Sequence, residues 1–131
     1  MAAASATEVG GRDHLVVWYN TRCPVCDAGI NRQRQQLKAG RVEFRDINLE
    51  PEALAGYGAS LEDVRRRLHA IDAGGRLLVG ADVAIAVWAV TPGEKWLARL
   101  LGNPVVRPMA CFGYDRFADI LYAWNRRKGH W

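Results

Sequence analysis

A continuous apolar run, Leu15 to Tyr19, is the first strong pattern along the chain. β-Branched and aromatic residues without alternation are typical of a strand covered on both faces, as in a parallel or mixed sheet. The segment Val42 to Ile47 alternates at a period of two, which predicts a strand with one covered face. Two further short runs, Leu68 to Asp72 and Arg76 to Gly80, flank a glycine-rich turn and predict a hairpin. The pattern therefore predicts four strands.

Helical spacing of apolar residues fills the segments between and after these strands. The first predicted helix runs from about Pro24 to Lys38 and turns a stripe that includes Cys26 toward the core. Further helices are predicted over Leu61–Leu68 with Ser60 as the cap, over Asp82–Val90, over Glu94–Leu101, and in a C-terminal segment with the stripe Phe117, Ile120, Leu121 and Trp124. This order of elements predicts an α/β fold, a mixed sheet flanked by helices with a helical C-terminal extension. We expect the C-terminal stripe to pack on the sheet.

Length and composition favour a single globular domain. The chain has 131 residues, of which 50% are hydrophobic and 24% charged, enough for one core and too few for two. Residues 1–13 are small and polar, and they are predicted to be a disordered tail before a domain over residues 14–131. The formal net charge is only +4, so the basic clusters at 65–67 and 126–128 are interpreted as solvated helix faces and not as a nucleic-acid site.

Hydropathy also bears on where the protein works. The most apolar later run, Ala81 to Val90, has about half of the roughly 20 residues that a membrane span needs. Residues 1–13 contain no apolar segment of the kind found in secretory leaders. We therefore expect a cytoplasmic protein without a membrane span. In such a reducing compartment, a close pair of cysteines is more often catalytic or metal-binding than structural.

The chemically reactive pattern is the dithiol Cys23-Pro24-Val25-Cys26, placed where the first strand leads into the first helix. Proline is favoured at the first helical position. A thiol just before it faces unpaired backbone N–H groups that stabilise a thiolate, and Arg22 adds a positive charge. Cys23 is therefore the candidate nucleophile. Cys26, one turn further along on the buried stripe, is expected to be shielded and to resolve a mixed disulfide formed at Cys23.

Two other interpretations of the cysteines stay open at this point. The pair can be inert, with Cys26 a small core residue and Cys23 an idle thiol. The pair can also belong to a zinc site, but structural zinc takes four Cys or His ligands, and the remaining candidates are scattered: His14, His69, Cys111 and His130. We therefore expect no metal. Cys111, in an apolar stretch, is interpreted as a packed thiol.

Blocks of sequence well beyond the cysteines form a pattern known from one family. They are residues 18–26, 68–76, 80–82 and 87–88, followed by Pro92-Gly93, Trp96-Leu97, Pro104 and Asn125-Arg126. In these blocks the chain resembles the DCC family of thiol-disulfide oxidoreductases. The resemblance implies a thioredoxin-like fold and a reversible Cys23/Cys26 couple. The chain departs from the family signature at Asn20-Thr21, where the family has Asp-Gly.

The dithiol is also similar to the Cys-Pro-x-Cys sequence of glutaredoxins. In glutaredoxins the helix start that corresponds to Gly80-Ala81-Asp82 binds a glutathione carboxylate, which implies an anion site here and glutathione as a candidate co-substrate. The proline that thioredoxins and glutaredoxins place before the third strand is absent, and Leu68-His69 stands there. His69 is either a structural strand-end residue or, with Arg22 and Pro24, a modulator of the thiols.

The sequence thus predicts a thioredoxin-like domain that exchanges disulfides with a protein or with a low-molecular-weight thiol of the glutathione type. No bound cofactor is expected. The alternative is a catalytically silent domain of the same fold that binds a partner.

Overall fold

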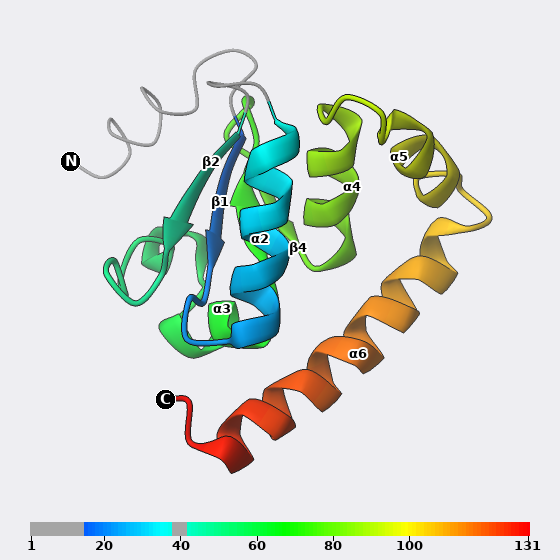
Figure 1. Cartoon of the computed structure of the whole chain (residues 1–131). Coiled ribbons are helices and arrows are strands. Elements are labelled where there is room, and N and C mark those ends of the chain that lie inside the picture. Colours follow the sequence, from blue (N-terminus) through cyan, green and yellow to red (C-terminus); the bar gives the residue numbers. More distant parts are fainter. Residues whose placement is uncertain (1–14, 38–41) are drawn as a thin grey trace.

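Four strands form one mixed sheet in the order β2-β1-β3-β4 (Figure 1). The structure is a computed structural model, and it describes residues 15–37 and 42–131. The strands are β1 (Leu15–Tyr19), β2 (Val42–Asp46), β3 (His69–Ile71) and β4 (Leu77–Val79). β1 runs parallel to β2, whereas the β1–β3 and β3–β4 pairs are antiparallel. This mixed sheet with flanking helices confirms the predicted thioredoxin-like α/β class.

Helices surround this sheet in the described part of the chain. They are α2 (Pro24–Gln36), the 3-10 helix η1 (Ala55–Tyr57), α3 (Leu61–Arg66), α4 (Ala81–Ala89), α5 (Lys95–Leu101) and α6 (Arg107–Lys128). Ser60 caps α3 in a complete capping box with Asp63. α2 and α3 each end two residues before the predicted position, and the predicted tail of residues 1–13 lies outside the described residues. None of the described helices is long and apolar enough to cross a bilayer.

Strand β1 is buried along its whole length, as its unbroken apolar run predicts. Val16 and Trp18 belong to a core cluster that includes α3, whereas Leu15 and Val17 belong to a second cluster that includes Val83 of α4. Because successive side chains of a strand point to opposite faces, the two clusters lie on the two sides of the sheet. β1 itself therefore exposes no polar side chain, and the next polar residues of the chain lie beyond its carboxyl end.

The C-terminal helix α6 does not pack as its apolar stripe predicts. Phe117, Ile120 and Trp124 are exposed, whereas Ala118 and Asn125 are buried. α6 makes its main contacts with α3 and α4 and runs obliquely past them (Figure 1). The prediction that the stripe packs on the sheet is therefore wrong. The stripe does not reach the sheet because residues of α3 and α4 already pack against the two faces of β1.

Polar contacts hold α6 against the segment that leads into β3. The hydroxyl of Tyr114 accepts a hydrogen bond from the Leu68 N–H at 3.0 Å. The Arg67 guanidinium pairs with Asp115 at 2.9 Å and with Asp119 at 3.0 Å. Burial raises the pKa of Tyr114 to about 12, so its hydroxyl stays neutral under physiological conditions. The start of β3 and the middle of α6 therefore form one connected unit.

Replacing Tyr114 with Phe should lower the free energy of unfolding by about 1–3 kcal/mol, because the Leu68 N–H then loses its acceptor inside the protein. Urea unfolding followed by tryptophan fluorescence measures the change. Tyr57→Phe is the matched control, since the Tyr57 side chain is exposed on η1, and it should change the value by less than about 0.5 kcal/mol. Equal effects of the two substitutions would contradict a stabilising role for the Tyr114 contact.

Candidate functional site

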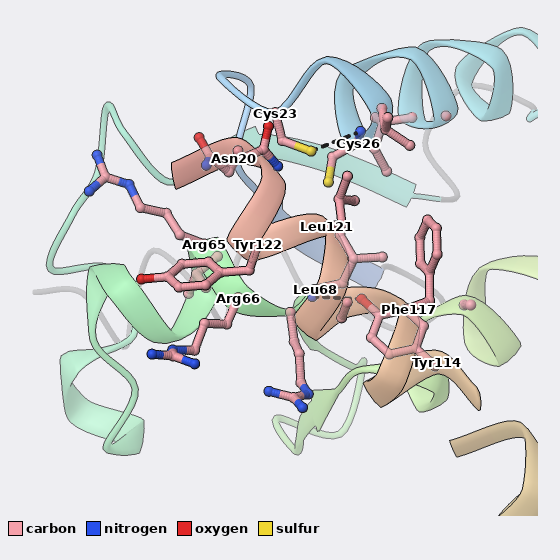
Figure 2. A pocket seen from close by; sticks show the side chains of 18 of the residues that line it. Asn20, Cys23, Cys26, Arg65, Arg66, Leu68, Tyr114, Phe117, Leu121 and Tyr122 are labelled. Carbon is pink, nitrogen blue, oxygen red and sulfur yellow. Dashed lines mark hydrogen bonds between the residues drawn. The ribbon is translucent and has the colours of Figure 1, made fainter. Parts of the chain in front are cut away.

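The dithiol lies at the start of α2, just after the carboxyl end of β1 (Figure 2). Cys23 is the N-cap residue of α2 with extended backbone angles, φ −85° and ψ 112°, and Pro24 occupies the first turn. The Cys23 Sγ accepts a hydrogen bond from the Cys26 N–H at 3.3 Å. The sulfur thus takes the place of a capping serine or aspartate oxygen. At this position the free N–H groups and the helix dipole favour a negative charge.

The burial of the two thiols is the reverse of the sequence-based expectation. Cys23 is only 1% exposed, whereas Cys26 is partly exposed. The periodicity of the first helix placed Cys26 on the inward stripe and predicted it to be the shielded thiol. That prediction is wrong because α6 lies close to the start of α2, where its Asn125 contacts Cys23.

The pKa values of the two thiols are shifted in opposite directions. The pKa of Cys23 is lowered to about 6, mainly because its thiolate accepts a hydrogen bond from the Cys26 thiol. Burial opposes this shift, while the Cys26 N–H and the Asn125 side chain add to it. The pKa of Cys26 is raised, because its proton is held by the Cys23 sulfur and its side chain is desolvated. At neutral pH Cys23 is therefore the thiolate, and Cys26 is the thiol that donates to it.

Asn125 of α6 was not among the predicted site residues. It is 1% exposed, and its Oδ1 lies 2.6 Å from Nδ1 of His130. Because an amide oxygen only accepts hydrogen bonds, His130 carries a proton on Nδ1 in this contact and leaves the Asn125 amide N–H groups for Cys23. The sequence held one signal for this residue: Asn125 directly follows Trp124 in the predicted C-terminal helix. A polar residue that is buried in a helix needs a hydrogen-bond partner.

A cavity of about 440 Å³ lies beside the dithiol, between α2, α3, α4 and α6 (Figure 2). Cys23 and Cys26 form part of its wall. Much of the remaining lining is apolar and includes Leu68, Phe117 and Leu121. This volume falls in the range of small-molecule sites. The two thiols therefore adjoin a pocket of defined size.

The candidate modulators Arg22, Pro24 and His69 are not among the residues that line this pocket. The side chains of Arg22 and Pro24 are exposed. His69 is buried in β3 beside Trp18, and its Nδ1 lies 2.9 Å from the Arg67 carbonyl. Burial lowers the pKa of His69, so its ring is neutral at pH 7 and Nδ1 donates to that carbonyl. A role of these three residues in tuning the thiols stays a prediction.

The predicted anion site, Gly80-Ala81-Asp82, forms the start of α4 and lies outside the pocket lining. The Asp82 carboxylate accepts two hydrogen bonds from Arg107, at 2.9 and 2.7 Å. A Cβ atom added at Gly80 would lie 3.4 Å from the Tyr114 ring and 3.6 Å from the Asp115 carboxylate. An aromatic ring and two carboxylates therefore already surround this helix start. A role of this helix start in binding an anion stays a prediction.

The other titratable residues of the described chain form no second centre of this kind. Cys111 is partly buried on α6 and is not part of the pocket lining. Within residues 15–37 and 42–131, no group of three or more His, Cys, Asp or Glu residues is arranged to hold a metal ion. The dithiol with its pocket is therefore the candidate site.

Comparisons with known proteins point to one family. A family model described as DCC1-like thiol-disulfide oxidoreductase matches residues 17–127. The matched segment contains both cysteines of the dithiol and Asn125. Neither the comparison with curated proteins nor the comparison with solved structures gave a match.

Alkylation of Cys23 by iodoacetamide should rise with pH around a midpoint of about 6, because only the thiolate reacts. An ordinary thiol titrates near about 8.5. Asn125→Ala should move the midpoint upward, since the thiolate loses a hydrogen-bond donor while the neutral thiol loses little. Asn31→Ala on the exposed side of α2 is the control and should leave the midpoint unchanged. Mass spectrometry of each labelled cysteine gives the profiles, and an unmoved midpoint in Asn125→Ala would contradict the assignment.

Proposed function

Because the chain belongs to the DCC1-like thiol-disulfide oxidoreductase family, we propose that it exchanges electrons between the Cys23/Cys26 dithiol and a disulfide substrate. The observation that carries this proposal is the hydrogen-bonded pair of thiols at the start of α2, in which the pKa of Cys23 is lowered and that of Cys26 raised. These opposite pKa shifts make one thiol a nucleophile and the other a proton donor within one helical turn.

In the first step, the Cys23 thiolate attacks one sulfur of a substrate disulfide R–S–S–R′. A bond forms between the Cys23 Sγ and the sulfur of R, the S–S bond of the substrate breaks, and the electron pair leaves on R′–S⁻. The Cys26 N–H and the Asn125 side chain stabilise the thiolate before the attack. The product is a mixed disulfide at Cys23.

In the second step, Cys26 resolves this mixed disulfide. The raised pKa of Cys26 depends in part on the neighbouring Cys23 thiolate, so it falls once that charge is lost. The Cys26 proton passes to R′–S⁻, the Cys26 thiolate attacks the Cys23 Sγ, and R–S⁻ leaves and takes up a proton from solvent. Two electrons and two protons have then passed to the substrate, and a Cys23–Cys26 disulfide remains.

A thiol must return the dithiol to its reduced form after each turnover. We propose glutathione or a similar low-molecular-weight thiol for this role, as the Cys-Pro-x-Cys sequence predicts. A cytoplasmic location, where such thiols are abundant and reduced, is consistent with this proposal. Both the co-substrate and the location stay predictions.

Cys23→Ser should abolish reduction of a small disulfide, because a serine hydroxyl does not ionise near neutral pH. Cys26→Ser should still carry out the first step and accumulate a mixed disulfide at Cys23, which intact-protein mass spectrometry detects as an added mass. Cys111→Ser on α6 is the matched control, since Cys111 is outside the pocket lining, and it should turn over like the wild type.

Turnover by Cys23→Ser, or the lack of an adduct on Cys26→Ser, would contradict the proposed order of attack. If the wild-type protein exchanged with no disulfide at all, the alternative of a catalytically silent binding domain would be favoured. In that case both serine variants should keep the same partner affinity as the wild type.

A further inference from the structure

The charged residues that line the pocket are all arginines. The lining contains no aspartate or glutamate of the described residues, but it contains four arginines, Arg32, Arg65, Arg66 and Arg67. Three of them are paired with carboxylates, in the contacts Arg32–Glu94, Arg65–Glu62 and Arg67–Asp115. Arg66 makes no salt bridge within the described residues, and its guanidinium carbon lies 4.4 Å from the centroid of the Tyr122 ring. Because carboxylates neutralise the other three arginines, the attraction of this wall for an anionic ligand comes from Arg66.

Asn20 places an unpaired hydrogen-bond donor at the dithiol end of the pocket. It is 2% exposed, and its carbonyl accepts the Cys23 N–H at 3.2 Å. Its Oδ1 accepts a hydrogen bond from Asn48 at 2.7 Å, but its Nδ2 has no partner among the described residues. Arg65, which donates to the other end of the same Asn48 side chain, also has an unpaired buried nitrogen, Nε. Buried donors are normally paired, so an acceptor group on a ligand fits this end of the pocket.

Contacts within the protein occupy the backbone N–H and carbonyl of Leu68, to which an extended peptide would bind. The Leu68 N–H donates to Tyr114, and the Leu68 carbonyl accepts the Gly80 N–H at 2.8 Å. Addition of a substrate strand needs free backbone groups of this kind. Cys23, moreover, is only 1% exposed, whereas the pocket beside it is large enough for a small molecule. These contacts favour a small substrate over a folded protein.

From these observations we propose that the pocket binds a small organic disulfide that combines an apolar body with a carboxylate close to its sulfur. The inference rests on the proposed function, because it names the substrate class of the same dithiol. The apolar body lies against Leu68, Phe117 and Leu121, and the carboxylate accepts a hydrogen bond from Asn20 Nδ2 in the positive field of Arg66. The two unpaired donors, Asn20 Nδ2 and Arg65 Nε, together with the charge of Arg66 select an acid over a neutral disulfide.

The reaction of this substrate follows the two steps given above. Cys23 Sγ forms a bond to the sulfur that carries the apolar acid, and the other half of the disulfide leaves as a thiolate. Cys26 then attacks Cys23 Sγ and releases the apolar acid as a thiol, while the Cys23–Cys26 disulfide forms. Two molecules of a low-molecular-weight thiol of the glutathione class then return the two electrons to the protein and leave joined as their own disulfide.

Single-turnover kinetics with a matched series of 2-pyridyl disulfides test the substrate class. Every probe releases the same 2-thiopyridone, and the half that stays on Cys23 is ethyl, heptyl or 1-carboxyheptyl. Rates are divided by the rate of free glutathione with the same probe. The normalised rate should rise from ethyl to heptyl by up to about fourfold for each buried methylene. It should rise by about a further tenfold from heptyl to 1-carboxyheptyl, because the carboxylate gains a hydrogen bond and a favourable field.

Two variants test the acid-binding end through the ratio of the 1-carboxyheptyl rate to the heptyl rate. Asn20→Asp keeps the acceptor oxygen that contacts Asn48 but replaces the donor with a charged oxygen, and should reduce the ratio to about one or below. Asn31→Asp makes the same charge change on the exposed side of α2 and should keep the wild-type ratio. Arg66→Gln should also lower the ratio, whereas Arg99→Gln on α5 should not. Both rates are measured on the same variant, so their ratio does not depend on the fraction of folded protein or on the reactivity of Cys23.

The outcomes separate this inference from the proposed function. Equal normalised rates for all three probes, or an unchanged ratio in Asn20→Asp and Arg66→Gln, would overturn the substrate class while the exchange reaction stands. Faster normalised reduction of insulin disulfides than of the heptyl probe would overturn the preference for a small substrate. Release from none of the probes would instead overturn the proposed function itself.

Discussion

Burial of β1 on both faces is the constraint on which the arrangement of the site depends. A strand without an exposed face can present polar residues only at its ends, and the carboxyl end of β1 leads directly to Asn20 and Cys23. The antiparallel register that pairs Trp18 with His69 brings Leu68 beside the end of β1. The nucleophile, the Asn20 side chain and the backbone groups of Leu68 thus meet at one edge of the core. Their proximity is a consequence of how the sheet is packed.

Direct hydrogen bonds to the sulfur add to the effect of the helix start on the reactivity assigned to Cys23. The pKa of Cys23 is lowered to about 6, and the groups that lower it touch the sulfur: the Cys26 thiol, the Cys26 N–H and the Asn125 side chain. A Cys-Pro-x-Cys helix start alone would therefore be a weaker nucleophile than this assembled site.

α6 changes the dithiol from a group at a helix start into one wall of a pocket. It covers Cys23, contributes Asn125 to the thiolate, and occupies the Leu68 N–H through Tyr114. The same placement leaves apolar residues such as Ile120 exposed on the outer side of the helix. The side of α6 that faces the pocket therefore carries Asn125 together with the stripe residues Phe117 and Leu121, whereas Ile120 of the same stripe faces solvent. Reactivity and substrate selection both depend on where this one helix lies.

The sequence by itself determined the features that are encoded within a few neighbouring residues. The buried strand Leu15–Tyr19, the Ser60 capping box and the helix start at Cys23-Pro24 each depend on local periodicity or on hydrogen bonds within one turn, so they could be predicted and are confirmed. Only the tertiary structure decided that Cys23 is the buried thiol, that Asn125 acts on it, and that a pocket with four arginines lies beside it. Periodicity shows that a helix has an apolar face, but it does not specify which element covers that face. Those three features come from contacts between elements that are far apart in the sequence, such as α2 and α6, and no local pattern records them.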